Sequence, residues 1–140
     1  KVIMILNINF KRCDIMKLNP DCIRDILLLT EKETSYTHSL KISKFDSERT
    51  QLLQYNRDEL FYHIEQCIMS DLIIVDKPLY YYTIECLTPK GHSFIENIRK
   101  DTTWNKVKSI SKQLGSSSLE ALFQISTTVI SELIKKQIGL

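Results

Sequence analysis

The stretch LTPKGHSFIENIRKDTTWNK, residues 87–106, marks an abrupt change from strand-forming to helix-forming sequence. The residues before it, 79–86, are rich in the aromatic and β-branched side chains that favour strands. Thr88 can cap a helix, and Pro89 fits the first helical turn because no hydrogen bond is lost there. The pattern therefore predicts a strand that stops at a helix start. Gly91 costs about 1 kcal/mol relative to alanine inside a helix, so we expect its backbone to approach the preceding strands closely.

Two more helices are predicted downstream. One restarts near Asp101 and carries an apolar stripe at Trp104, Val107, Ile110 and Leu114, a spacing at which we expect Trp104 to belong to the core. The sequence GSSS at 115–118 ends this helix. Ser117 and Glu120 then form a predicted capping box for a final helix over residues 119–138.

Upstream of the opening stretch, the sequence predicts a hairpin, two helices and a short strand. The runs 72–75 and 79–87 flank the turn sequence Asp76-Lys77-Pro78, which indicates a β-hairpin. Asn56 and Glu59 form a capping box for a helix over 56–70, with apolar residues recurring on one face. The pair Asn19-Pro20 opens a helix over 20–32, and the alternating residues 40–42 indicate an edge strand.

The order helix, short strand, helix, hairpin, helix is that of a winged helix. We therefore expect an α+β, mainly helical fold, in which a winged helix-turn-helix is followed by two or three C-terminal helices. A chain of 140 residues has the size of one domain. Within it, residues 16–114 are expected to form the winged helix and its following helix. Residues 115–140 are expected to form an amphipathic helix of the same domain or a dimerisation element, and residues 1–15 an extension outside the core.

Composition narrows the classes of function. A net charge of +2 is too small to indicate nucleic-acid binding by itself, and residues 56–92 carry six acidic side chains against three basic ones. The four cysteines form no C-x-x-C pair, which favours buried thiols in a reducing cytoplasm. The three histidines lack ligand spacing, so no metal or cofactor is expected. No run approaches the roughly 18–20 apolar residues that span a bilayer.

Four segments carry a resemblance to a known family: MKLNPDCIRDILL, ELFYHIEQCIMSDLI, LTPKGHSFIENIRKDTTWNKVK and the serine-rich entry to the apolar last helix. Their specific part is LT-x-x-G-x-x-F followed by D-T-x-W-N-K. Over about residues 16–138 the chain resembles the bacterial and phage proteins grouped as domain-of-unknown-function family 2513. The resemblance implies a fold similar to winged-helix regulators and a phage or prophage setting, and it implies no particular activity.

The first functional hypothesis is a regulator that binds double-stranded DNA. In a winged helix, the helix over 56–70 would enter the major groove and the wing would touch the backbone or minor groove. Against this, the helix exposes Asp58, Glu59 and Glu65, and carboxylates repel phosphate. The predicted contacts are Arg57, Tyr62, Gln66 and Lys77, with Lys41, Lys44 and Arg49 as candidate phosphate neighbours.

The second hypothesis is an interaction module that binds a protein partner, or a second copy of itself, without binding DNA. The final helix supports it, because its apolar surface is too broad for a solvated helix and includes Leu122, Phe123, Val129, Ile130, Leu133 and Ile134. Packing of this helix on its own domain would explain the same pattern. Binding to a membrane surface is a weaker reading, since the polar face of the helix carries few Lys and Arg.

Catalysis is not expected. No G-x-S-x-G elbow, H-E-x-x-H motif or Gly-rich phosphate loop occurs in the chain. His63 and Glu65 are close in sequence, but they are predicted to point to different sides of a helix. No small-molecule substrate is inferred, and the sequence predicts a non-catalytic regulatory protein.

Overall fold

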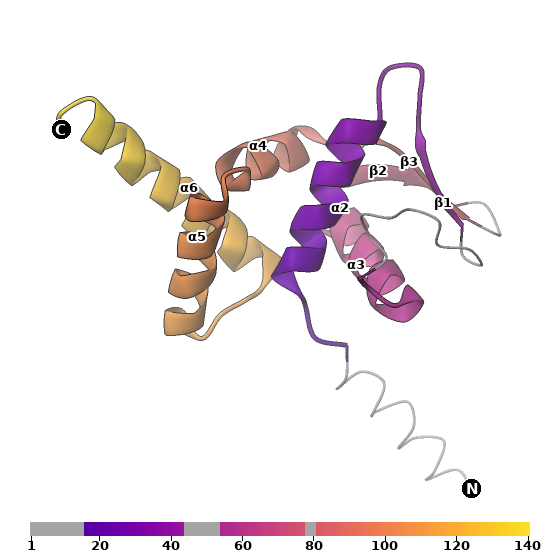
Figure 1. The fold of residues 1–140 in the computed structure, drawn as a ribbon, viewed down its shortest axis with the longest axis horizontal. Helices are drawn as coiled ribbons and strands as arrows, with labels where there is room; N and C mark the ends of the chain where they lie inside the picture. Colours follow the sequence, from indigo (N-terminus) through magenta and orange to yellow (C-terminus); the bar gives the residue numbers. More distant parts are fainter. Residues whose placement is uncertain (1–15, 44–53, 78–80) are drawn as a thin grey trace, which may run out of the picture.

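The computed structural model describes residues 16–43, 54–77 and 81–140 (Figure 1). Within these ranges lie five helices and three strands: α2 (Pro20–Glu33), β1 (Leu40–Ser43), α3 (Arg57–Met69), β2 (Ile73–Asp76), β3 (Tyr81–Leu87), α4 (Pro89–Ile98), α5 (Asp101–Leu114) and α6 (Leu119–Gln137). The fold is therefore mixed α+β and mostly helical. The predictions made for residues 1–15, Lys44 and Arg49 fall outside the described residues.

The three strands form one antiparallel sheet in the order β1-β3-β2. β1 pairs with β3 so that Leu40 lies opposite Ile84, and both side chains are buried. Ile42 and Tyr82 are buried beside them. On the other side of β3, β2 has a register irregularity between Ile74 and Val75. One face of the sheet therefore closes the core, and the predicted hairpin is confirmed in its two strands.

Helix α2 lies at the centre of the fold, between α3 and the sheet on one side and α4 on the other (Figure 1). Its core residues Cys22, Ile23, Ile26 and Leu27 are almost completely buried. The helix begins as predicted: the Asn19 side chain accepts hydrogen bonds from the backbone N–H groups of the first turn, and Pro20 opens that turn. Because α2 touches both halves of the chain, contacts along its length position α3 relative to the C-terminal helices.

The strand β3 stops at Leu87 because Thr88 caps α4. The Thr88 hydroxyl oxygen accepts a hydrogen bond of 2.9 Å from the N–H of Gly91. A Cβ atom on Gly91 would lie 2.1 Å from the carbonyl oxygen of Leu72, which no side chain tolerates. The predicted close approach of this glycine to the hairpin is confirmed, and it lets Phe94 and Ile98 become fully buried.

Two local predictions for the C-terminal helices are wrong. Leu114 is 68% exposed rather than part of the buried stripe, because it is the last residue of α5 and the chain turns away at Gly115, which has a φ of 67°. Ser118, not Ser117, caps α6 by accepting the N–H of Ala121. The turn after α5 extends through Ser116, whose N–H donates to the Ser111 carbonyl, so the capping position moves one residue along the chain.

Candidate interaction surfaces

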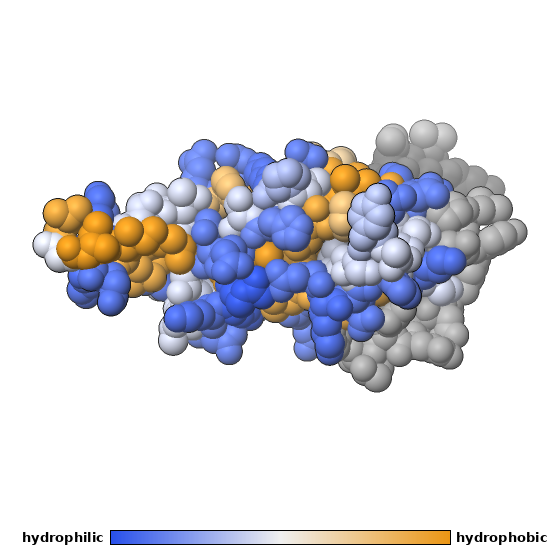
Figure 2. Space-filling model, turned by 90° about the horizontal axis from the view of Figure 1, so that it is seen from above, coloured by the Kyte–Doolittle hydropathy of each residue, from blue (hydrophilic) through white to orange (hydrophobic). Residues whose placement is uncertain are grey.

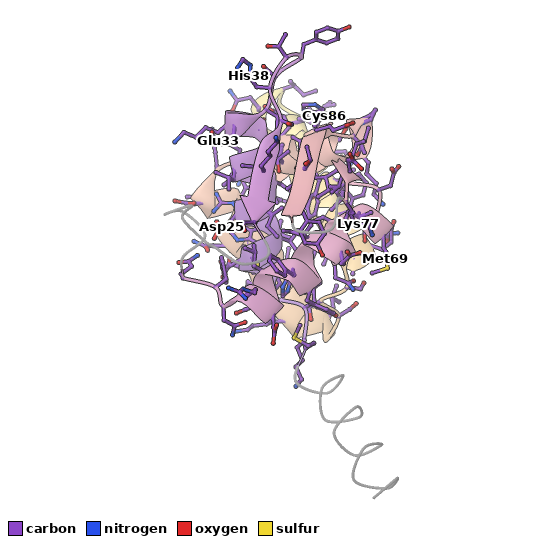
Figure 3. The ribbon with its side chains drawn as sticks, turned by 90° about the vertical axis from the view of Figure 1, so that its right-hand side faces the viewer. Asp25, Glu33, His38, Met69, Lys77 and Cys86 are labelled. Atoms are coloured by element: carbon purple, nitrogen blue, oxygen red, sulfur yellow. The ribbon has the colours of Figure 1, made fainter. Side chains whose placement is uncertain are left out.

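Helix α3 turns one face toward solvent beside the β2–β3 hairpin. Its opposite face is buried through Leu60, His63, Ile64 and Cys67. Positions separated by three or four residues share a helix face, and the outermost line of α3 is Asp58, Tyr62, Glu65 and Met69. Met69 is 68% exposed and lies on the same side of the molecule as Lys77 (Figure 3). Sequence reasoning missed Met69, although continuing the 58-62-65 spacing by four residues reaches it.

The predicted base-contacting residues are not brought together at the centre of this face. Arg57 and Gln66 are nine positions apart, which at about 3.6 residues per turn places them half a turn from each other. They therefore lie at opposite edges of the exposed face, with Arg57 exposed and Gln66 half-buried. Tyr62 is half-buried and lies near the centre. A groove occupied by this helix would meet Asp58, Tyr62 and Met69 first.

Glu65 ties α3 to the hairpin. Its carboxylate accepts a 3.0 Å hydrogen bond from the Tyr82 hydroxyl and lies 3.3 Å from the ammonium of Lys77. Burial and the bond to Glu65 together raise the pKa of Tyr82 to about 12. Lys77 was predicted to contact nucleic acid from the wing. In this structure its charge is paired with Glu65, so a phosphate contact would require the pair to open.

Glu59 and His63 are engaged inside the molecule. The Asn19 side-chain amide donates to the Glu59 carboxylate at 3.0 Å, and the Asn19 backbone N–H donates to Nε2 of His63 at 2.7 Å. Nδ1 of His63 lies 2.7 Å from the carbonyl oxygen of Glu59, so the ring carries its proton on Nδ1. His63 is 1% exposed. This cluster joins α3 to the start of α2 and offers no free acid–base pair.

Of the predicted phosphate neighbours, only Lys41 falls among the described residues. It is exposed on β1 between the buried Leu40 and Ile42, so it points away from the core. Lys44 and Arg49 lie outside the described residues. The structure therefore places one of the three predicted phosphate neighbours, on strand β1.

Side chains and carbonyl groups between Ile98 and Lys108 join the start of α5 to α2. The indole N–H of Trp104 donates to the Asp21 carboxylate at 2.7 Å, and the ammonium of Lys108 donates to the same oxygen at 2.9 Å. Arg24 donates to the Ile98 carbonyl at 3.0 Å and to the Asp101 carboxylate at 2.8 Å. Trp104 is 2% exposed. Trp104 therefore belongs to the core, as predicted. The polar groups of Trp104, Lys108 and Arg24 are engaged in contacts within the chain.

The apolar residues predicted on the last helix divide into two sets. Leu122 and Val129 are buried against α4 and α5, and Phe123 is half-buried with its ring 5.6 Å from that of Phe94. These three residues pack within the chain. Ile130 is half-buried, whereas Leu133 and Ile134 are 44% and 54% exposed. Of the apolar surface predicted on α6, its C-terminal end therefore remains exposed.

A hollow of about 700 Å³ lies near the end of β3 and the loop before β1. Glu31, Glu85, His92, His38 and Cys86 line it; the last two are labelled in Figure 3. The His38 ring is engaged by the Thr37 hydroxyl at 2.9 Å. Across residues 16–43, 54–77 and 81–140, no group of three or more His, Cys, Asp or Glu side chains is arranged to hold a metal ion.

Among the helices that the structure describes, none is both long enough and apolar enough to cross a membrane.

Fold and surface together define a small α+β chain that exposes two faces, one on α3 and one at the end of α6. The family model described as "Hypothetical protein (DUF2513)" matches residues 17–118, and the chain belongs to this family. It is also similar to an "Uncharacterized protein" of Haemophilus influenzae (strain ATCC 51907 / DSM 11121 / KW20 / Rd). That relative is 32% identical over 127 residues, which cover 85% of this chain and 99% of the relative. No solved structure gives a significant match.

Proposed function

We propose that this chain is a non-catalytic regulatory module of the winged-helix type, which acts by binding a protein partner through α3 and the β2–β3 hairpin. The order α2, β1, α3, β2, β3 with sheet order β1-β3-β2 supports the winged-helix assignment. Fold alone does not decide a ligand. The choice of partner therefore rests on the chemistry of the exposed face.

The observation that carries the proposal is the mixed apolar and acidic character of the α3 face. Met69 and Tyr62 belong to the residue types enriched in protein interfaces, and methionine adapts its shape to a partner. Phe61 is half-buried on the same helix, and its ring packs on that of the buried Tyr82 with centroids 5.3 Å apart. These side chains sit beside the exposed carboxylate of Asp58. Phosphate would be repelled by that charge, whereas a basic protein surface would be attracted.

The partner is therefore expected to present an apolar side chain flanked by Lys or Arg. Co-purification of the tagged chain from the cells that encode it tests this, with Met69→Lys as the disrupting variant. Leu114→Lys is the matched control, because Leu114 is also 68% exposed and also ends a helix. We expect a specific protein to be lost with Met69→Lys and retained with Leu114→Lys. Equal retention by both variants would contradict the proposed surface.

Double-stranded DNA is the second candidate ligand, and one contact favours it. The central carboxylate of the α3 face, Glu65, is offset by Lys77 and hydrogen-bonded by Tyr82, which reduces the repulsion of phosphate. Fluorescence anisotropy on random duplex DNA at low and moderate salt tests this candidate. Binding that falls steeply with salt would support it. Arg57→Ala and Gln66→Ala should then weaken selected sites, whereas Lys41→Ala should weaken all sequences alike.

A further inference from the structure

The C-terminal end of α6 carries an apolar stripe that nothing in the described chain covers. Leu133, Ile134 and Ile138 are 44%, 54% and 64% exposed, and Ile130 is half-buried at the same face. The spacing of three and four residues aligns them along the helix. The first half of α6 lies on α4 and α5, and its second half extends away from the other helices (Figure 1). The apolar surface at the left end of Figure 2 is this part of the molecule.

The exposed end is nevertheless a defined helix with a complete C-terminal cap. Gly139 has a φ of 82°, and its N–H donates to the Lys136 carbonyl. The N–H of Leu140 donates to the Lys135 carbonyl at 2.8 Å, which completes a Schellman motif. A helical segment of this length gains little stability by itself in water. Packing of its apolar stripe against a partner would add the stability that contacts with the rest of the described chain do not provide.

We infer that the stripe Ile130, Leu133, Ile134 and Ile138 is a homodimerisation surface on which a second copy of this chain packs antiparallel. The stripe contains no charge, so it can face its own copy without repulsion. Lys135 and Lys136 lie between Ile134 and Ile138 in sequence, and a parallel pair of helices would place the four lysines of the two copies at matching heights along the axis. An antiparallel pair centred on Ile134 offsets the two Lys136 by four residues, about 6 Å along the helix axis.

The same antiparallel register also brings apolar residues level with apolar residues and a lysine level with a glutamate. Positions equally distant from Ile134 meet at the same height along the helix axis, so Ile130 of one copy lies level with Ile138 of the other. Lys136 then lies level with Glu132 of the second copy, which brings opposite charges nearer than the parallel arrangement does. A twofold arrangement of this kind uses one surface patch twice and closes on itself.

The size of the stripe indicates a reversible dimer. Side chains of this size and exposure can remove at most about 400 Å² per copy, or about 800 Å² in total, which is below the standard size of specific interfaces and fits a weak, transient contact. We therefore expect association that depends on protein concentration rather than a permanent dimer. The inference does not depend on what α3 binds, because the two surfaces belong to different elements.

Sedimentation velocity of the full 140-residue chain over a hundredfold range of concentration tests the inference. The wild type should shift from monomer to dimer, and Ile134→Asp should remain monomeric with unchanged helix content by circular dichroism. Thr128→Asp is the matched control: it adds the same charge at an exposed position of α6 away from the stripe, and it should dimerise like the wild type. Ile134→Leu should also dimerise.

Three results would overturn the inference. The wild type could remain monomeric throughout the concentration range. Ile134→Asp could dimerise as well as the wild type, which would place the interface elsewhere. The chain could also remain monomeric in solution yet co-sediment with vesicles of anionic lipid, a binding lost in Ile134→Asp; the stripe would then be a membrane-surface contact instead.

Discussion

The indole nitrogen of Trp104, in the first turn of α5, lies 2.7 Å from a carboxylate oxygen of Asp21, in the first turn of α2. The Lys108 ammonium reaches the same oxygen, and the Arg24 guanidinium lies 5.9 Å from the centre of the indole ring. Although partial burial acts to raise it, the pKa of Asp21 lies below its usual value because Lys108 and Trp104 donate hydrogen bonds to the carboxylate. The Asp21 carboxylate thus joins α2 to α5, two helices that are distant in sequence.

We predict that Trp104 and Asp21 are energetically coupled. Trp104→Phe keeps an aromatic ring in the core but removes the N–H donor, and Asp21→Ala removes the acceptor. A double-mutant cycle measured by urea unfolding should give a coupling free energy of about 1.5–3 kcal/mol, as expected for a hydrogen bond to a charged group. Additive effects of the two substitutions would contradict a direct bond.

Gly91→Ala should destabilise the protein although alanine is normally the better helix former. The new Cβ would lie 2.1 Å from the Leu72 carbonyl oxygen, a backbone atom that cannot move without disturbing the hairpin. We expect a loss of more than about 2 kcal/mol in the free energy of unfolding. At Gly115 the space is open and only the left-handed φ of 67° opposes alanine, so Gly115→Ala should cost about 1 kcal/mol. A stabilised Gly91→Ala variant would refute the close approach.

The ion pair between Arg99 and Glu31 should make stability depend on pH in the acid range. The bidentate hydrogen bonds from Arg99 lower the pKa of Glu31 below its usual 4.5. A carboxyl group whose pKa is lower in the folded state stabilises the fold fully above its unfolded pKa and loses that contribution as the pH falls through the folded pKa. The advantage of the wild type over Arg99→Gln should therefore be constant above about pH 4.5 and shrink below it. Because both groups are partly exposed, it should not exceed about 1 kcal/mol.

Unfolding free energies of the two proteins at pH 7, 5, 4 and 3 measure this dependence. Arg99 also pairs with Glu96 at 2.8 Å, so Glu31→Gln is the second variant needed to separate the two acids. An advantage of the wild type that grows as the pH falls would have the wrong sign for this account.

His63 should be required for stability. His63→Leu removes the acceptor for the Asn19 backbone N–H and leaves that donor without its partner, which should cost about 1–3 kcal/mol. His92→Leu, at an exposed position of α4, should change stability little. Thermal unfolding of both variants distinguishes them. Similar melting temperatures for the two would argue against the Asn19–His63 contact.

Capping residues could be predicted from sequence because their chemistry is local. Asn19, Asn56 and Thr88 each accept a backbone N–H two or three positions along the chain, so a short window of sequence contains all the information. The close approach at Gly91 could also be predicted. Glycine destabilises a helix, so its presence there indicates that neighbouring backbone leaves no room for a side chain. The capping residue of α6 was misplaced because the length of the turn before it depends on a bond from Ser116 back to Ser111.

The candidate surfaces were harder to predict than the fold. The nine-residue spacing of Arg57 and Gln66 already places them half a turn apart on a helix, so their separation could have been predicted from the sequence. The pairing of Lys77 with Glu65 joins two elements and has no local signature. For α6, periodicity identified an apolar helix correctly, but it could not tell that α4 and α5 cover only the first half.

The central claim is that the α3 face meets a protein, and photocross-linking from that face tests it most directly. A benzophenone amino acid would replace Met69 in the full chain, and Leu114 in the control, in the cells that encode it. We predict a discrete adduct from position 69 that protease removes, nuclease leaves unchanged and position 114 does not form. An adduct that nuclease removes, or the same adducts from both positions, would contradict the account.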